Sequence, residues 1–140
     1  MTRASAWLIA VLALAAGAAH GANEGRARGE AELAKRLAGY QAGKPRDCVL
    51  LSELHGTQII DGTAILYRGN GDTLYLNRPS GAAILRRDIV MVDYPHGSQL
   101  CRMDIVELYD SGTRMPRGSI SLGSFVPYVK VKPGQGTRTP

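Results

Sequence analysis

The sequence predicts a mainly β protein, a small antiparallel β-barrel or sandwich with a short N-terminal helix after a signal peptide. Three observations lead to this prediction. From Cys48 onward, short apolar runs alternate with turn signals such as Asp61-Gly62 and Asn70-Gly71. The chain has 140 residues, which suits one ordinary domain. Its two cysteines offer a covalent link within that domain.

Residues 1–22 have the three-part pattern of a secretory signal peptide. Arg3 gives a positive start, residues 4–19 carry no charge, and small residues follow. We expect cleavage after Ala18 or after Ala22. A membrane-spanning helix needs about 20 apolar residues, so we expect no transmembrane span in the mature form. The predicted location is periplasmic or secreted.

The rest of the chain divides into three segments. Residues 23–46 are a polar leader, in which Leu33, Leu37 and Tyr40 would share one face of a short helix. Residues 47–131 carry the strand signals and form the expected β domain. The composition of residues 132–140 is typical of a disordered tail. Within the leader helix, Glu32 and Arg36 are spaced to pair.

The stretch TAILYRGNGDTLYLNR, residues 63–78, predicts a β-hairpin around a two-residue type I′ loop at Asn70-Gly71. In that register Tyr67 lies opposite Leu74, and the two belong to an apolar face. The other face is mixed, and it is the part of the hairpin that could bind a ligand. The candidate ligand-binding residues on this mixed face are Arg68, Tyr75 and Asn77.

Three later segments complete the expected domain. Residues 88–93 are apolar on both faces and predict a central strand. Residues 98–110 fit either a helix or a tight turn at Cys101 to Asp104 followed by a strand, and we expect the turn and the strand. The segment SISLGSFVPYVKV predicts a last strand that is broken near Gly123 and Pro127.

Cys48 and Cys101 are expected to form a structural disulfide, because an exported chain meets an oxidising compartment. In the chain-entropy model, closing this loop stabilises the fold by about 4 kcal/mol. A redox pair and two metal ligands are the alternatives. Redox cysteines usually lie two residues apart, and metal ligands need companions at short spacing.

The chain is basic, with 17 Lys and Arg against 12 Asp and Glu, a net charge of +5. Removing residues 1–22 takes away only Arg3. No acid follows Asp110, so the C-terminal end is basic. Such an end suits an anionic polymer, a lipid surface or nucleic acid, and it also suits an ordinary solvated surface. Since an exported protein seldom meets nucleic acid, we expect none, and we add Arg114 and Arg117 to the candidate ligand-binding residues.

No constellation of reactive residues is present. The serines lack a Gly-x-Ser-x-Gly elbow, and His55 and His96 lack a metal-binding spacing. We therefore expect no catalytic residue, no cofactor and no metal. The alternative is a small metal-dependent or acid/base hydrolase that uses His55 and His96 with an aspartate such as Asp61 or Asp93.

Several segments resemble a family of small exported bacterial proteins known as a domain of unknown function. The resemblance rests on IIDGTAILYR, the hairpin into LYLNRPSGA, GSQLC with Asp104 soon after, and MPRG with LGSFVPY. It covers about residues 46–130. It implies export and a compact domain with cysteines near strand starts, and it implies no assigned activity or catalytic residue.

Together these observations predict a non-enzymatic binding or structural module of the cell envelope. Its expected partner is an envelope component, either an anionic polymer or a protein.

Overall fold

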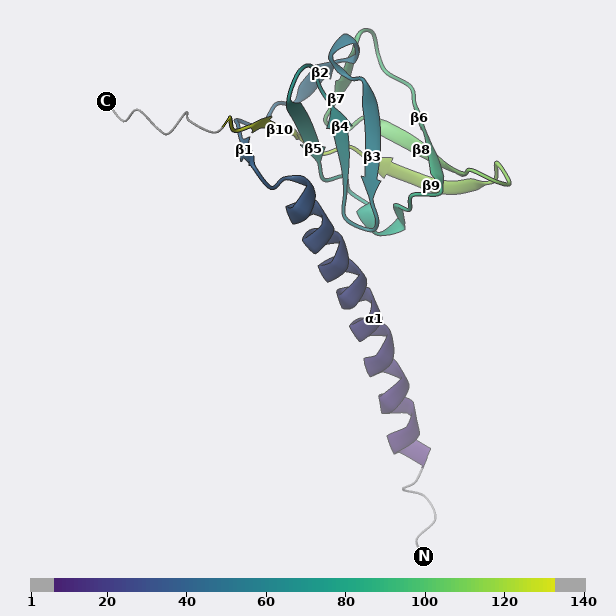
Figure 1. Cartoon of the computed structure of the whole chain (residues 1–140). Helices are drawn as coiled ribbons and strands as arrows, with labels where there is room; N and C mark the ends of the chain where they lie inside the picture. The colour runs from purple at the N-terminus through teal and green to yellow at the C-terminus, as the bar shows by residue number, and fades with distance from the viewer. Residues whose placement is uncertain (1–6, 133–140) are drawn as a thin grey trace, which may run out of the picture.

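The computed structural model describes residues 7–132 (Figure 1). Residues 1–6, which include the positive start of the expected signal peptide, and residues 133–140, most of the expected tail, lie outside this range. The fold is mainly β, and its three antiparallel sheets are not closed into a barrel, as expected for a sandwich. The strand orders of the sheets are β1-β10-β5-β4-β3, β2-β7 and β6-β8-β9.

The described residues form one long helix, two short 3-10 helices and ten strands. The helices are α1 (Trp7–Arg36), η1 (Leu51–Glu53) and η2 (Ala82–Ile84). The strands are β1 (Tyr40–Ala42), β2 (Cys48–Leu50), β3 (Gly56–Ile60), β4 (Ala64–Arg68), β5 (Thr73–Asn77), β6 (Ile89–Asp93), β7 (Gln99–Cys101), β8 (Ile105–Asp110), β9 (Pro116–Ser121) and β10 (Phe125–Lys130).

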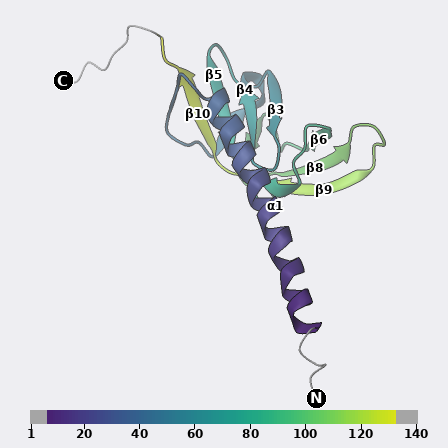
Figure 2. The ribbon, with the colours of Figure 1, turned by 60° about the horizontal axis from the view of Figure 1, so that its bottom comes forward.

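The five-stranded sheet separates two apolar clusters. Because side chains alternate across a strand, β3, β4 and β5 each contribute to both clusters. The inner cluster joins this sheet to the other two sheets, and the outer cluster lies under α1, which crosses the outer face of the sheet (Figure 2). The inner cluster is Val49, Ile59, Ile65, Tyr67, Tyr75, Leu85, Leu100, Val106, Leu108, Ile120, Leu122 and Phe125. The outer cluster is Leu33, Ile60, Ala64, Leu66 and Leu76.

The C-terminal part of α1 docks on the β body as the leader pattern predicts, with one difference. Leu33 is buried and Leu37 is partly buried, both against the outer cluster. Arg36 and Glu32 form the expected ion pair at 3.7 Å. The helix ends at Arg36, however, because Gly39 takes a left-handed conformation, with φ of 80°. The prediction that Tyr40 lies on the helix is therefore wrong, because Tyr40 is the first residue of β1.

The β4–β5 hairpin is present, but its predicted register is wrong by one residue. Tyr67 lies opposite Tyr75, and Arg68 lies opposite Leu74. The Gly69 N–H donates to the Thr73 carbonyl at 2.8 Å, which leaves three residues in the loop and not two. Gly71, with φ of 59°, takes the left-handed conformation that the turn requires. A slip of one residue changes which side chains share a face of the sheet.

The later strands agree only in part with the expectations. The turn between Cys101 and Asp104 and the strand after it are confirmed by β7 and β8. The prediction of a central strand at residues 88–93 is wrong, because β6 lies at an edge of its three-stranded sheet. The break near Gly123 is confirmed, while Pro127 lies inside β10. The Pro127 carbonyl accepts from the Gly43 N–H just beyond β1, so the missing N–H also points to that side, away from β5.

Candidate functional site

The hairpin face expected to bind a ligand is not a single face. Arg68 is exposed on the α1 side of the sheet, whereas Tyr75 and Asn77 point into the inner core. Tyr75 is 7% exposed and Asn77 is fully buried. The one-residue shift in register is the physical reason, since it moves Tyr75 to the same face as Tyr67. The prediction that Arg68, Tyr75 and Asn77 share one exposed face is therefore wrong.

The polar end of Tyr75 is satisfied within the protein. Arg46 donates to the Tyr75 hydroxyl at 3.2 Å, and that hydroxyl donates to Glu53 at 3.3 Å. The Arg46 guanidinium also lies 5.8 Å from the centre of the Tyr75 ring. Burial and the Glu53 carboxylate raise the pKa of Tyr75. This cluster ties the loop before β2 and η1 to the five-stranded sheet.

Arg114 and Arg117 lie in the β8–β9 hairpin, which extends away from the rest of the β body (Figure 1). Arg117 donates to Asp110 at 2.5 Å, so its charge is matched. Asp110 also accepts from Gly112 and Thr113. The hydrogen bonds from Arg117 and Thr113 hold the pKa of Asp110 well below its usual range. Asp110 thus organises this loop.

The residues of the alternative hydrolase come from different segments, since His55 precedes β3, Asp61 follows it and Asp93 ends β6. His55 is exposed, and its Nε2 lies 2.5 Å from Asn70 Oδ1. His96 is also exposed, beyond the end of β6. Among residues 7–132, no group of three or more His, Cys, Asp or Glu side chains is arranged to hold a metal ion.

The disulfide between Cys48 and Cys101 is confirmed. The two cysteines are direct partners in the β2–β7 ladder. The bond therefore closes a two-stranded sheet whose buried side chains, Val49 and Leu100, belong to the inner core. The Cys101 N–H donates to the Asp104 carboxylate at 2.7 Å, which fixes the turn that follows.

A hollow of about 930 Å³ lies between α1 and the turns that follow β3 and β5. Its lining brings together segments that are far apart in the sequence. Acidic and basic side chains both line it, with the basic ones in excess. The arginines are Arg26 and Arg28 from α1, Arg78 after β5, and Arg86 and Arg87 after η2; the acids are Glu30, Glu32 and Asp61.

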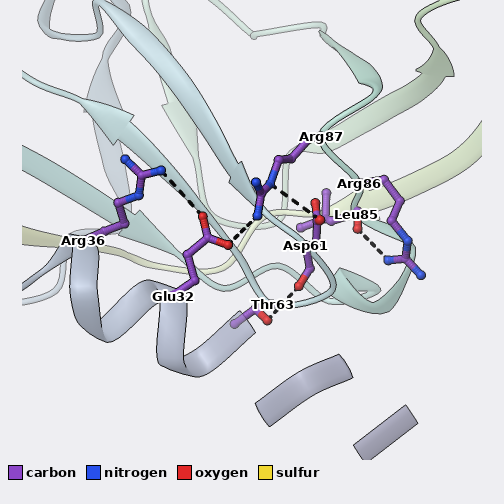
Figure 3. A network of polar contacts seen from close by, with 7 residues as sticks. All are labelled: Glu32, Arg36, Asp61, Thr63, Leu85, Arg86 and Arg87. Carbon is purple, nitrogen blue, oxygen red and sulfur yellow. Dashed lines mark hydrogen bonds and ion pairs between the residues drawn. The ribbon is translucent and has the colours of Figure 1, made fainter. Parts of the chain in front are cut away.

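Two of these arginines are paired with carboxylates of α1. Arg78 donates to both oxygens of Glu30, at 2.6 and 2.8 Å. Arg87 donates to Glu32 at 2.5 Å and lies 3.6 Å from Asp61 (Figure 3). The hydrogen bonds from Arg78 lower the pKa of Glu30. Arg78 and Arg87 thus connect the helix to the β body.

The other three arginines have no carboxylate within ion-pair distance in the described part of the chain. Arg86 is held by backbone carbonyls instead. Its Nη1 donates to the Leu85 carbonyl at 2.6 Å (Figure 3). The same nitrogen donates to the Ala83 carbonyl at 2.9 Å. Neutral carbonyls orient a guanidinium without cancelling its charge. Arg86 is therefore fixed in place and remains a net positive charge at the hollow.

Arg86 also lines a second hollow, of about 470 Å³, between η2 and the β6 and β9 strands. Arg117 lines this second hollow too, so one of the sequence-derived candidates lies beside the arginine cluster. Arg114 does not line either hollow. The two hollows share Ala83 and Arg86, so they meet at η2.

Sequence reasoning missed Arg78, Arg86 and Arg87. A signal was present, since Arg86 and Arg87 are adjacent and follow the turn at Pro79-Ser80-Gly81. Two basic residues in a loop are common on solvated surfaces, however. Only the fold brings them next to the helix arginines.

No protein-family model, curated protein or solved structure matches the chain. The resemblance to exported proteins of unknown function stays a prediction. Within residues 7–132, no helix has an apolar stretch sufficient to cross a membrane.

Proposed function

We propose that the protein is a non-enzymatic module of the cell envelope that binds an anionic polymer at the arginine-lined hollow. The observation that carries the proposal is the charge of Arg26, Arg28 and Arg86, which have no ion-pair partner among the described residues and lie beside the paired Arg78 and Arg87. Arginines bind carboxylate and phosphate groups through parallel hydrogen bonds. Several of them along one hollow suit a polymer that carries a charge on each unit.

Two further features support an envelope location. Residues 1–22 have the composition of a signal peptide. The Cys48–Cys101 disulfide suits an oxidising compartment such as the periplasm. An envelope of this kind offers many polymers with phosphate or carboxylate groups, which is the chemistry that the arginines recognise.

The test uses inorganic polyphosphate as the probe and purified protein lacking residues 1–22. The protein is titrated against labelled polyphosphate at low and at physiological salt. Because exposed charges are screened, we expect binding to weaken by about tenfold as the salt rises. A binding constant that does not change with salt would contradict the proposal.

The matched variants remove three positive charges each. Arg26→Gln/Arg28→Gln/Arg86→Gln acts on the hollow, whereas Lys44→Gln/Lys130→Gln/Lys132→Gln acts on exposed lysines elsewhere. We expect the first variant to lose about tenfold or more in affinity and the second to lose far less. An equal loss in both variants would show that overall charge, and not this site, binds the polymer.

A further inference from the structure

We propose that the C-terminal half of α1 is a strap that occupies part of the anion site. In this arrangement Glu30 and Glu32 hold Arg78 and Arg87 until an oligoanion takes their place. The helix then leaves the β body, while its own Arg26 and Arg28 stay in contact with the bound polymer. The proposal rests on the function proposed above, and it names the regulation and the ligand class of the same site.

The contact between Glu30 and Arg78 has the geometry of a bound ligand. Both carboxylate oxygens accept from the two terminal nitrogens of the guanidinium, at 2.6 and 2.8 Å. A carboxylate or phosphate group of a ligand would make the same pair of parallel hydrogen bonds. Glu30 therefore stands where an anionic group of the polymer would bind.

Glu32 has the same role for Arg87, two residues further along the helix. It bridges Arg36 of its own helix and Arg87 of the β body, which Asp61 also contacts (Figure 3). Loss of Glu32 would leave Arg87 with a single carboxylate partner at 3.6 Å among the described residues. Arg87 would then be able to bind a second anionic group.

Few side chains of α1 are buried against the β body, so the helix can be released from it. Among residue 21 and residues 23–36 of α1, only Gly29 and Leu33 are buried. The ion pairs are partly exposed, since the side chains of Arg78 and Arg87 are 50% and 62% exposed. Pairs of this kind are accessible to water and to ions, so a ligand that offers linked anionic groups can compete with them. The N-terminal part of α1 extends away from the β body (Figures 1 and 2).

These contacts define the ligand. Two carboxylates hold the strap, so a ligand with at least two linked anionic groups is needed to replace both of them. A single phosphate replaces only one carboxylate and leaves the other pair in place. The ligand class is thus an oligoanion, and polyphosphate and orthophosphate are the matched probes that distinguish the two cases.

The experiment follows hydrogen exchange of the helix amides during binding. We expect polyphosphate to increase exchange across residues 30–37 several-fold, and orthophosphate at the same phosphate concentration to leave it unchanged. Glu30→Gln/Glu32→Gln should exchange faster without ligand and should bind polyphosphate about tenfold more tightly. Glu24→Gln/Asp72→Asn, which removes two exposed carboxylates that do not line the hollow, is the control for net charge and should do neither.

The possible results separate this proposal from the function on which it rests. If polyphosphate binds while exchange of residues 30–37 slows or stays constant, the strap is wrong and the anion site stands. If the double variant exchanges faster but neither the wild type nor the double variant binds polyphosphate, both proposals are wrong. The docked helix then covers no binding site for an anionic polymer. Faster exchange together with tighter binding in the double variant supports both.

Discussion

The side chain of Asn77 makes two hydrogen bonds with the backbone of Gly123. Its amide nitrogen donates to the Gly123 carbonyl at 2.7 Å, and its amide oxygen accepts from the Gly123 N–H at 2.9 Å. Asn77 is fully buried, and a side chain at Gly123 would meet the Arg78 carbonyl, since an added Cβ would lie 2.4 Å away. This pair holds the break between β9 and β10 against the end of β5.

We expect Asn77→Ala to lower the free energy of unfolding by about 2 to 4 kcal/mol. The substitution leaves the donor and the acceptor of Gly123 without their partner in a buried position. Urea denaturation measures the change, with the exposed Asn23→Ala as the control. A loss in Asn77→Ala no greater than that of the control would show that these hydrogen bonds do not hold the turn.

Gly29 and Gly25 provide a matched pair on one helix. A Cβ at Gly29 would lie 1.8 Å from Thr63 Oγ1, whereas nothing lies within 4 Å of one at Gly25. Gly29→Ala is expected to displace the helix and to speed hydrogen exchange of residues 30–37, even though alanine favours helix formation. Gly25→Ala should instead stabilise α1 by about 1 kcal/mol. Equal behaviour of the two variants would rule out a close contact at Gly29.

Asp93 makes stability depend on pH. Its Oδ1 and the Tyr67 hydroxyl are buried, and neither has a hydrogen-bond partner among the described residues. Burial, and then the charge of Asp104, raise the pKa of Asp93. A raised carboxyl pKa means that the folded state holds the proton more tightly than the unfolded chain does. The stability that the folded state gains from the protonated Asp93 is fully present below the ordinary carboxyl pKa. It is lost as the pH rises through the raised pKa of the folded state.

Asp93→Asn is therefore expected to raise the free energy of unfolding more at neutral pH than at about pH 4, because asparagine carries no charge at either pH. Urea denaturation at both pH values measures the difference. Asp72→Asn, which removes an exposed carboxylate from the β4–β5 loop, is the control. An equal increase in the free energy of unfolding at the two pH values would show that the charge of Asp93 does not destabilise the folded state.

Loss of the disulfide should destabilise the fold by about 4 kcal/mol, the cost expected for a loop of this length. Cys48→Ala/Cys101→Ala tests this in denaturant, and the wild type with and without a reducing agent gives a second measurement. If neither comparison shifted the unfolding midpoint, the β2–β7 pair would be held by Val49 and Leu100 alone.

The fold class, the disulfide and the turn at Cys101 to Asp104 could be predicted, because local patterns indicate the strands and the turn and because the chain has two cysteines to pair. The hairpin register could not, because the signal at Asn70-Gly71 suits a three-residue loop as well as a two-residue one. The position of β6 at a sheet edge depends on strand order, which alternation of side chains does not encode.

The candidate site could be predicted even less. Its arginines come from α1, from the end of β5 and from the turn after η2, and no short window of sequence contains all three. The expectation of an anionic partner rests on the net charge, on the basic C-terminal end and on the mixed hairpin face. Of the five candidate ligand-binding residues, Arg117 alone lines either hollow, and its own charge is matched by Asp110.

The close contact at Gly29 and the burial of Leu33 together fix the position of α1 along the sheet. Glycines recur at positions 21, 25 and 29, so a shift by one helical turn would still present a glycine to Thr63. The same shift would pull Leu33 out of the apolar cluster and put Gly29 in its place, leaving a void. A glycine followed four residues later by a leucine is needed to satisfy both the contact with Thr63 and the burial in the outer cluster. The helix therefore docks in a single position along the sheet.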